Sequence, residues 1–389
     1  MLELLFLLYL ATEDGQLSPE DRRRRDRRTP RLALRKYNQS AFYYLFGSGN
    51  EQALLNCCGV DHSVFRKLLV VFEPVWKSHT IDRSTGRIKK LKQSSAHGLR
   101  FGRKREIDAT GSLGLVLYWY RTRGSVARST AMAFGLTSSP MYSWLKFSRW
   151  ILLYGLQYHP SAKISLPSSD DIEKYVEAIG AKYFALHAHR VWSAMDGLKL
   201  RLQKSTDWAI QNRYYNGWGG NTYVNCVFVF APDGRIRICT LNAPGTFHDS
   251  TMADYGVYDK IEQLYDEYQV KVVVDSAFNV SKKNYLIKSA QQDPESQQGV
   301  ILNRQATALR QLSEHGMRMI QGQFPRLKDP MELEEFGDRK VILNLMVLLY
   351  NFQASEVGIN HILNSFMSRT EGFYSYEDLS ETANDIFNT

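Results

Sequence analysis

The order of apolar and polar positions divides the chain into a helical first part and a mixed second part. Residues 39–78 carry a helical apolar pattern that ends near Pro74, and the polar, basic stretch after it is expected to be a surface loop or linker. Residues 106–156 contain three helical segments separated by two short turns, the first of which includes Gly124. This order predicts an all-α region over residues 39–165.

From residue 170 onward the pattern alternates between strands and helices. A helical segment over 171–184 precedes a strand over 190–202, and residues 221–245 form a β-hairpin that turns at the sequence PDG. Three antiparallel strands, a helix and a parallel fourth strand predict an α/β domain with a ribonuclease H-like mixed sheet over residues 170–360. The segments expected after the hairpin are a helix over 252–270, a buried strand over 270–278, helices over 281–290 and 306–324, and an apolar closing helix over 341–358.

The helices over 106–156 follow the pattern of a helix-turn-helix. Gly124 breaks the chain after the first helix, Ser125 can cap the second, and Pro140 lies in the first turn of the third. A helix-turn-helix places one helix in the major groove of DNA, whereas a plain three-helix bundle would show the same pattern. The basic residues around these turns are candidate DNA contacts: Arg121, Arg123, Arg128, Lys146 and Arg149.

Charge separates the same two parts. Of the 389 residues, the first 195 hold 30 Lys and Arg against 16 Asp and Glu, a balance of +14, and the remainder hold 19 against 24, a balance of −5. The first half therefore suits contact with a polyanion, and the second has surplus carboxylates. A basic tail on an ordinary enzyme would give a similar asymmetry.

The ends of the chain and its cysteines bear on localisation. Residues 1–38 are expected to be a basic, disordered arm, since residues 18–36 are dense in arginine, and such an arm is typical of nuclear-localisation or phosphate-contacting segments. The first ten residues are apolar but too few to span a bilayer, so no membrane association is expected. The four cysteines show no CxxC spacing, which favours a reducing compartment. Residues 361–389 are interpreted as a C-terminal tail.

Three acidic residues occupy positions from which they could share metal ions. Asp196 interrupts the strand over 190–202, Asp275 ends an apolar run, and Glu314 lies on the helix over 306–324. The first strand of a ribonuclease H-like sheet and the strand after its first helix are adjacent, so the two aspartates are expected to meet. An apolar stripe would hold the helix of Glu314 against the same sheet. Such carboxylates are the ligands that divalent metals need for in-line phosphoryl transfer, although each acid alone also fits an ordinary turn, strand end or solvated helix.

Asp249 is a further candidate, in the sequence GTFHDST. It follows the third strand at the same end of the sheet, so His248 or Asp249 could assist metal or DNA binding. The sequence HDS is also a good N-cap for the helix that follows, and we favour the cap.

The motifs around these acids resemble those of a known family. AMDGLKLRL, NAPGTFHDSTMADYG, VVVDSAF and SEHGMRMIQGQFPRLKD are similar, in this order, to the motifs of the DDE endonuclease domain of Harbinger-type transposases. The resemblance covers roughly residues 190–355 and places the family's acids on Asp196, Asp275 and Glu314. Val274 and Phe278 depart from the family's motif around the second acid, but neither supplies a metal-binding atom.

The resemblance implies a transposase that nicks the ends of a transposon by hydrolysis, with Mg²⁺ or Mn²⁺ as cofactor. The freed 3′ hydroxyl then attacks a target phosphodiester and displaces its 3′ oxygen, which joins the transposon strand to the target. It also implies a Myb-like accessory protein as partner. Double-stranded DNA is the expected substrate, the arginine-dense arm favours a nuclear location, and a homo-oligomer is a further possibility. The alternative is a domesticated, catalytically silent DNA-binding or scaffold protein that keeps the fold.

Overall fold

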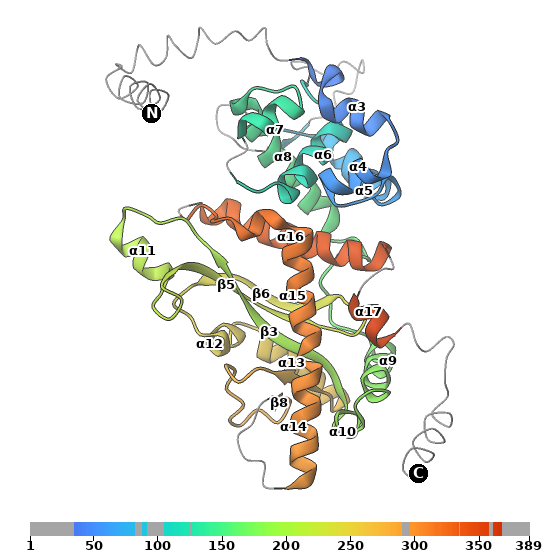
Figure 1. Ribbon diagram of the computed structural model, residues 1–389, viewed down its shortest axis with the longest axis vertical. Helices are drawn as coiled ribbons and strands as arrows, with labels where there is room; N and C mark the ends of the chain where they lie inside the picture. The colour runs from blue at the N-terminus through green and yellow to red at the C-terminus, as the bar shows by residue number, and fades with distance from the viewer. Residues whose placement is uncertain are drawn as a thin grey trace, which may run out of the picture.

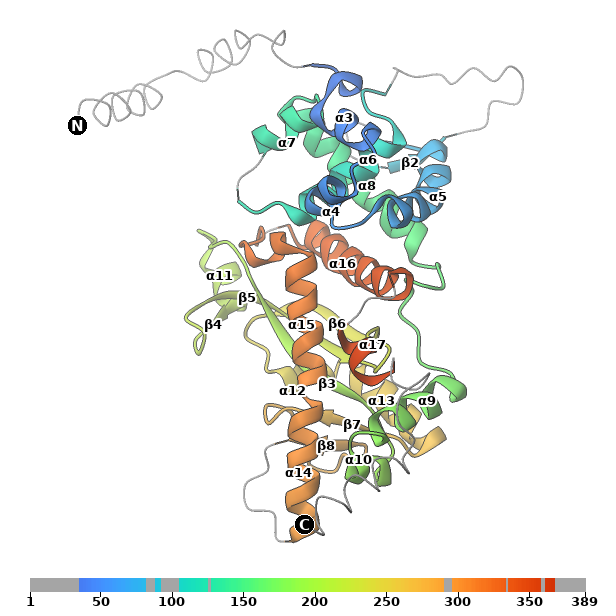
Figure 2. The same ribbon diagram turned by 45° about the vertical axis from the view of Figure 1, so that its right-hand side comes forward.

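The computed structural model describes residues 35–81, 88–91, 105–124, 127–289, 296–333, 335–357 and 361–367. A helical unit and an α/β unit follow one another along the long axis of the molecule, with helix α16 (Phe336–Glu356) between them (Figures 1 and 2). Most of the N-terminal arm and of the C-terminal tail expected from the sequence lies outside the described residues. Within those residues, no helix is long and apolar enough to cross a membrane.

The helical unit begins with a 3-10 helix and contains a short β-ribbon. Helix α5 shows why these segments are helical: Phe65, Leu68 and Phe72 recur at helical spacing and are fully buried, while the Asp61 side chain accepts a hydrogen bond from the Val64 N–H at 2.7 Å as N-cap. The elements of the unit are η2 (Tyr37–Gln39), α3 (Ala41–Gly47), α4 (Glu51–Cys58), α5 (His62–Ser78), β1 (His79–Ile81), β2 (Ile88–Lys90), α6 (Ala109–Arg121), α7 (Ala127–Ala133) and α8 (Ser138–Leu156).

The sequence predicted the helices of this unit correctly except in detail. Helices α6, α7 and α8 are the three expected over residues 106–156, and Gly124 follows the first with a φ of 79°. Helix α5 continues past Pro74 to Ser78, one turn further than expected. The structure confirms these helices, whereas their role as a DNA-binding helix-turn-helix stays a prediction.

The α/β unit is built around one mixed sheet. Its elements are α9 (Ser169–Gly180), α10 (Phe184–Ala188), β3 (Val191–Arg201), α11 (Trp208–Tyr214), β4 (Tyr215–Asn216), β5 (Asn221–Phe230), β6 (Ile236–Pro244), α12 (Asp249–Ala253), α13 (Val257–Tyr268), β7 (Lys271–Val274), β8 (Leu286–Lys288), α14 (Gln297–Leu309), α15 (Gln311–Gln323), η3 (Pro325–Lys328), α16 and α17 (His361–Phe366).

Strands in this sheet follow the order β6, β5, β3, β7, β8. The three strands β3, β5 and β6 are antiparallel neighbours, whereas β7 pairs in parallel with β3 and β8 in parallel with β7. The two-residue strand β4 pairs with the start of β5. Three antiparallel strands followed by a helix and a parallel strand are the arrangement expected from the sequence.

Helices cover both faces of the sheet. One face, which includes Ala194, Leu198 and Phe230, packs against α15 and α16, while the other, which includes Met195 and Val229, packs against α9, α12 and α13. Alternate residues of β3 thus enter different cores, as the pleat of a strand requires. Figure 1 shows α14 and α15 as an almost continuous rod across the sheet.

One expected helix is wrong. The sequence predicted a helix over 281–290, but residues 286–288 form strand β8 and the residues before it form turns. Backbone pairing with β7 decides the outcome, because Leu286 and Ile287 lie opposite Val272 and Val273 in a parallel ladder. Tertiary pairing of this kind overrides local preference in short segments.

Helix α16 joins the two units. The Tyr120 hydroxyl of α6 donates a hydrogen bond to the Ile342 carbonyl oxygen of α16 at 2.8 Å, and Lys146 of α8 forms an ion pair with Asp338 at 2.9 Å. On the opposite side, the Asn351 side chain exchanges hydrogen bonds with the backbone of Ile236 in β6 at 2.8 and 2.9 Å. The closing helix therefore belongs to the interior of both units.

Candidate active site

Asp196 and Asp275 meet at the ends of two parallel strands. The ladder between β3 and β7 ends at the pair Met195 and Val274, and each aspartate is the next residue along its chain. β3 itself continues beyond this point because β5 still pairs with it, Asp196 lying opposite Phe228. The convergence expected from the sequence is therefore present.

Asp275 begins a tight turn that ends at the buried residue Phe278. The Ser276 N–H donates a hydrogen bond to Asp275 Oδ1 at 2.6 Å, and the Phe278 N–H donates to the Asp275 carbonyl oxygen at 3.2 Å. The Phe278 ring is buried in the core beneath the turn. Phe278 thus fixes the turn in place.

Glu314 is linked to Asp275 by an arginine that is hydrogen-bonded to both carboxylates. The guanidinium of Arg310 donates one hydrogen bond to Asp275 and another to Glu314, both at 2.7 Å. Arg310 lies at the junction of α14 and α15, one turn before Glu314, so both side chains project from the same helical face. Burial opposes the charge of Arg310, but the two carboxylates raise its pKa. Asp275 and Glu314 are therefore held by a single cation.

Asp249 approaches the site from the opposite face of the sheet. A Cβ atom on Gly197 would lie 2.6 Å from the Asp249 Cγ, so the carboxyl group occupies the space that a side chain at 197 would fill. The N-cap that we favoured for this sequence is wrong, because His248 occupies the N-cap position without a side-chain hydrogen bond and Asp249 is the first residue of α12. Asp249 Oδ1 is buried and has no hydrogen-bond partner.

Burial and neighbouring carboxylates raise the pKa values of Asp196 and Asp249. Burial raises the pKa of Asp196 to about 6, and the nearby Asp275 and Asp249 contribute to the increase, whereas the Gly197 N–H and Arg310 act against it. Burial also raises the pKa of Asp249, as does Asp275, while Lys199 and His248 lower it. Mutual destabilisation of this kind is typical of acids that share a functional site.

The chemistry of these side chains fits a divalent cation. All four acids supply the hard oxygen ligands that Mg²⁺ and Mn²⁺ prefer, and the buried, unpaired oxygen of Asp249 is oriented toward the strand that carries Asp196. As they stand, however, the described residues contain no group of three His, Cys, Asp or Glu side chains that could hold a metal ion. The guanidinium of Arg310 is bonded to both Asp275 and Glu314, at the position where a shared cation would bind them.

The candidate DNA contacts have different environments. Arg149 is buried in the helical unit with its guanidinium 3.7 Å from the centre of the Trp119 ring, and burial lowers its pKa to about 10, so it is a packing residue and not an available DNA contact. Arg123 forms an ion pair with Asp329 at 3.3 Å, and Arg121 donates to the Gly322 carbonyl oxygen at 3.0 Å. Arg128 is exposed, as are the paired side chains of Lys146 and Arg123.

Three residues of the site were not identified from the sequence. Arg310 could have been found, because it lies four residues before Glu314 on the same helix, a spacing at which opposite charges interact. Gly197 and Lys199 follow Asp196 on β3, but their contacts with Asp249 depend on how α12 packs against the sheet. Sequence alone carries no signal for that packing.

Comparison with known proteins gives one match, over the segment that carries these acids. Residues 195–351 match the family model of the DDE superfamily endonuclease. The matched segment begins one residue before Asp196, ends within α16, and contains Asp249, Asp275 and Glu314. A search of curated proteins found no match, and a search of solved structures found none either. Residues 195–351 are therefore similar to a DDE superfamily endonuclease domain, and this similarity suggests a transposase-like nuclease.

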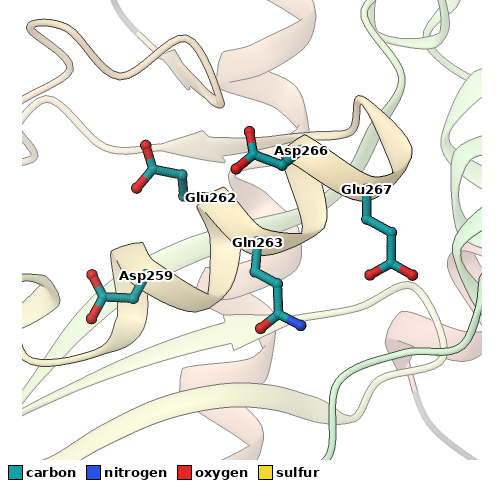
Figure 3. A pocket seen from close by; sticks show the side chains of 5 residues that line it. All are labelled: Asp259, Glu262, Gln263, Asp266 and Glu267. Atoms are coloured by element: carbon teal, nitrogen blue, oxygen red, sulfur yellow. The ribbon is translucent and has the colours of Figure 1, made fainter.

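Another acidic surface lies on α13 and is separate from the site. It is shallow and is formed by Asp259, Glu262, Gln263, Asp266 and Glu267. Figure 3 shows these side chains projecting from successive turns of the helix, with Gln263 and Glu267 on a different side from Glu262 and Asp266. None of the four acids of the site belongs to it, and its negative charge is unsuited to contact with a phosphate backbone.

Proposed function

We propose that this protein is a metal-dependent DNA endonuclease of the transposase type, with a ribonuclease H-like catalytic domain and Asp196, Asp275 and Glu314 as its catalytic carboxylates. The observation that carries the proposal is that Arg310 donates hydrogen bonds to both Asp275 and Glu314. Asp196 lies beside them, at the end of the neighbouring strand. The strand order β6, β5, β3, β7, β8 supports the ribonuclease H-like assignment. The motif order supports the Harbinger subtype.

The side chains would divide the work of phosphoryl transfer. Asp196, Asp275 and Glu314, with Asp249 as a fourth ligand, would hold Mg²⁺ or Mn²⁺, which neutralises charge on the attacking and leaving oxygens. Arg310 would leave Asp275 and Glu314 when their negative charge is taken up by the cation, and its guanidinium would then be free to bind a phosphate. Lys199, exposed beside Asp249, would contact the DNA backbone close to the reaction.

The helical unit would supply further contacts with double-stranded DNA. Arg128 is exposed, and Arg123 and Lys146 are exposed side chains whose acidic partners could be exchanged for phosphates. Counterion release at such contacts makes affinity fall steeply with salt. A nuclear location and a homo-oligomer belong to the same proposal, as does a Myb-like partner through the resemblance to Harbinger-type transposases.

A catalytically silent DNA-binding protein is the second candidate. One observation favours it: no three acids of the described residues are assembled for a metal ion, and Arg310 already neutralises two of them. In such a protein the arginine would be a permanent structural partner of the carboxylates.

Cleavage of supercoiled plasmid with Mn²⁺ separates the two candidates. We expect the wild-type protein to nick the plasmid, Asp275→Ala to lose the activity by at least a hundredfold, and Asp259→Ala to retain it as a matched control on the acidic surface of α13. Equal nicking by wild type and Asp275→Ala would reject the catalytic role of this site. Absence of nicking by the wild type would support the silent protein.

A further inference from the structure

Two exposed tryptophans lie on a projection beside the site. Residues 203–220 connect β3 to β5, and this segment, which we call the arm, contains α11 and β4. Trp218 is 95% exposed and Trp208 is 78% exposed, whereas the other five tryptophans of the chain are buried or half-buried. Figures 1 and 2 show the arm extending away from the sheet on the side of α12. Two exposed indole rings on one segment offer flat surfaces on which a ligand can stack.

The charge around the arm favours a polyanion as that partner. Residues 199–223 contain four basic residues and one acid, a balance of +3, although the second half of the chain is acidic overall. The acid, Asp207, is used as the N-cap of α11, where it accepts hydrogen bonds from the N–H groups of Ala209 and Ile210. The four basic residues are all exposed: Lys199, Arg201, Lys204 and Arg213.

The arm contacts Lys199 of β3 and the loop that leads to Asp249. The Lys199 ammonium lies 5.6 Å from the centre of the Trp218 ring, and the same charge lowers the pKa of Asp249. The Asn216 side chain donates to the Gly245 carbonyl oxygen at 2.8 Å, which ties the arm to the loop that precedes α12. Gly245 also packs against the backbone of Tyr223, where a Cβ would lie 2.5 Å from a carbonyl oxygen. The tryptophans therefore lie on a structure attached to the site.

We propose that the arm binds unpaired bases at the DNA end that the site processes, with Trp208 and Trp218 as stacking platforms and the neighbouring basic residues as phosphate contacts. Aromatic side chains that alternate with basic ones bind single strands without sequence preference, because every base offers a face for stacking. The inference rests on the proposed function, since it takes DNA as the substrate of the adjacent acids. It adds a requirement for unpaired nucleotides that the acids alone do not impose.

The test compares two DNA probes bound by the full-length protein in EDTA. One is a blunt duplex, and the other is the same duplex with a four-nucleotide 3′ overhang. We expect the overhang to bind about 5- to 100-fold more tightly, and Trp208→Ala/Trp218→Ala to abolish the difference. The Trp208→Phe/Trp218→Phe variant should retain most of it. Tyr158→Ala is the matched control, since Tyr158 lies two residues after the end of α8 and is also 78% exposed.

Each outcome bears on one proposal or the other. No preference for the overhang in the wild type, or an equal preference in the double alanine variant, would overturn the role of the arm. Circular dichroism of the variants verifies that they are folded, and the wild-type comparison does not depend on any variant. Plasmid nicking that persists without a preference for the overhang would retain the endonuclease and reject the arm. A preference without nicking would reject the endonuclease and retain the arm.

Discussion

Four carboxylates gather at the end of β3 and β7, and one guanidinium, that of Arg310, is bonded to two of them. The guanidinium of Arg310 neutralises charge on Asp275 and Glu314 through direct hydrogen bonds. Burial raises the pKa of Asp196 to about 6 and raises the pKa of Asp249 above its ordinary value. Function and stability are therefore opposed at these residues, as is common where charged groups are gathered for chemistry.

Replacing Arg310 by Met should destabilise the metal-free protein. The substitution removes two hydrogen-bonded ion pairs that are partly exposed, so we expect a loss of roughly 1–2 kcal/mol in the free energy of unfolding in EDTA. Mn²⁺ should then stabilise the variant more than the wild type, because it neutralises carboxylates that have lost their partner. Thermal unfolding with and without Mn²⁺ measures both effects, and an unchanged response to Mn²⁺ would contradict the account.

Asp196→Asn should stabilise the metal-free protein at neutral pH. The pKa of Asp196 is about 6 in the folded protein, against an ordinary value of 3.8, so the folded state binds its proton more tightly than the unfolded state. The protonated Asp196 carboxyl therefore favours the folded state at low pH. As the pH rises from about 4 to 7 this effect is lost, and the free energy of unfolding falls by roughly 1–3 kcal/mol. Asparagine carries no ionisable proton, so the variant does not undergo this decrease in stability.

Urea unfolding in EDTA at pH 4, 5, 6 and 7 would measure the pH dependence. The difference between Asp196→Asn and the wild type should grow with pH and level off near 7. Asp259→Asn, on the exposed face of α13, should follow the wild type. A constant difference across the range would show that the charge of Asp196 is not responsible.

At the scale of elements, the packing of α15 on the sheet fixes the position of Glu314. Gly316 lies two residues after this acid, and a Cβ at that position would come within 2.5 Å of the Phe230 ring of β5. Leu312 and Ile320 are buried on the same side of the helix, which gives the apolar stripe expected from the sequence. Glycine is needed at 316 because the helix lies so close to the strand.

Two glycine-to-alanine substitutions in this helix should therefore have opposite effects on stability. Gly316→Ala should cost about 1–3 kcal/mol of stability, since Phe230 or the helix has to move. Gly322→Ala should be neutral or stabilise by up to about 1 kcal/mol, because nothing lies within 4 Å of the added methyl group and alanine favours the helix. Chemical denaturation of both variants gives the comparison, and equal effects would mean that α15 does not pack on β5 as described.

The same elements show what the sequence could predict and why it could not predict the rest. Strands β3 and β7 and the helix of Glu314 follow from apolar periodicity, and adjacency of the strands follows from their order, so three acids could be placed from the sequence. Strand β8 and the orientation of Asp249 depend on pairing with β7 and on the missing side chain of Gly197. Contacts between elements set these features, and local pattern does not encode them.

At the scale of the whole molecule, α16 makes the helical unit and the α/β unit a single structure. Its residues are buried on nearly all sides from Ile342 to Ala354, and its partners include α8 on one side and β6 on the other. The asymmetry of charge between the two halves of the chain therefore does not correspond to two independent bodies.

We expect the protein to unfold in one cooperative transition despite its length. Far-ultraviolet circular dichroism and tryptophan fluorescence should give coincident midpoints, because loss of either unit exposes α16. Leu345→Ala, in the buried part of this helix, should shift both signals together and cost about 2–5 kcal/mol. Separate transitions for the two signals would show that the units are independently stable.

Asp196, Asp275 and Glu314, with Asp249, are proposed to form a divalent-cation site for phosphoryl transfer. Titration of the metal-free protein with Mn²⁺ detects such a site without requiring DNA or catalysis. Calorimetry should detect one or two Mn²⁺ ions bound by the wild type, with affinity reduced at least tenfold in Asp275→Asn and unchanged in Asp259→Asn. Equal binding by all three proteins, or no binding by the wild type, would contradict the account.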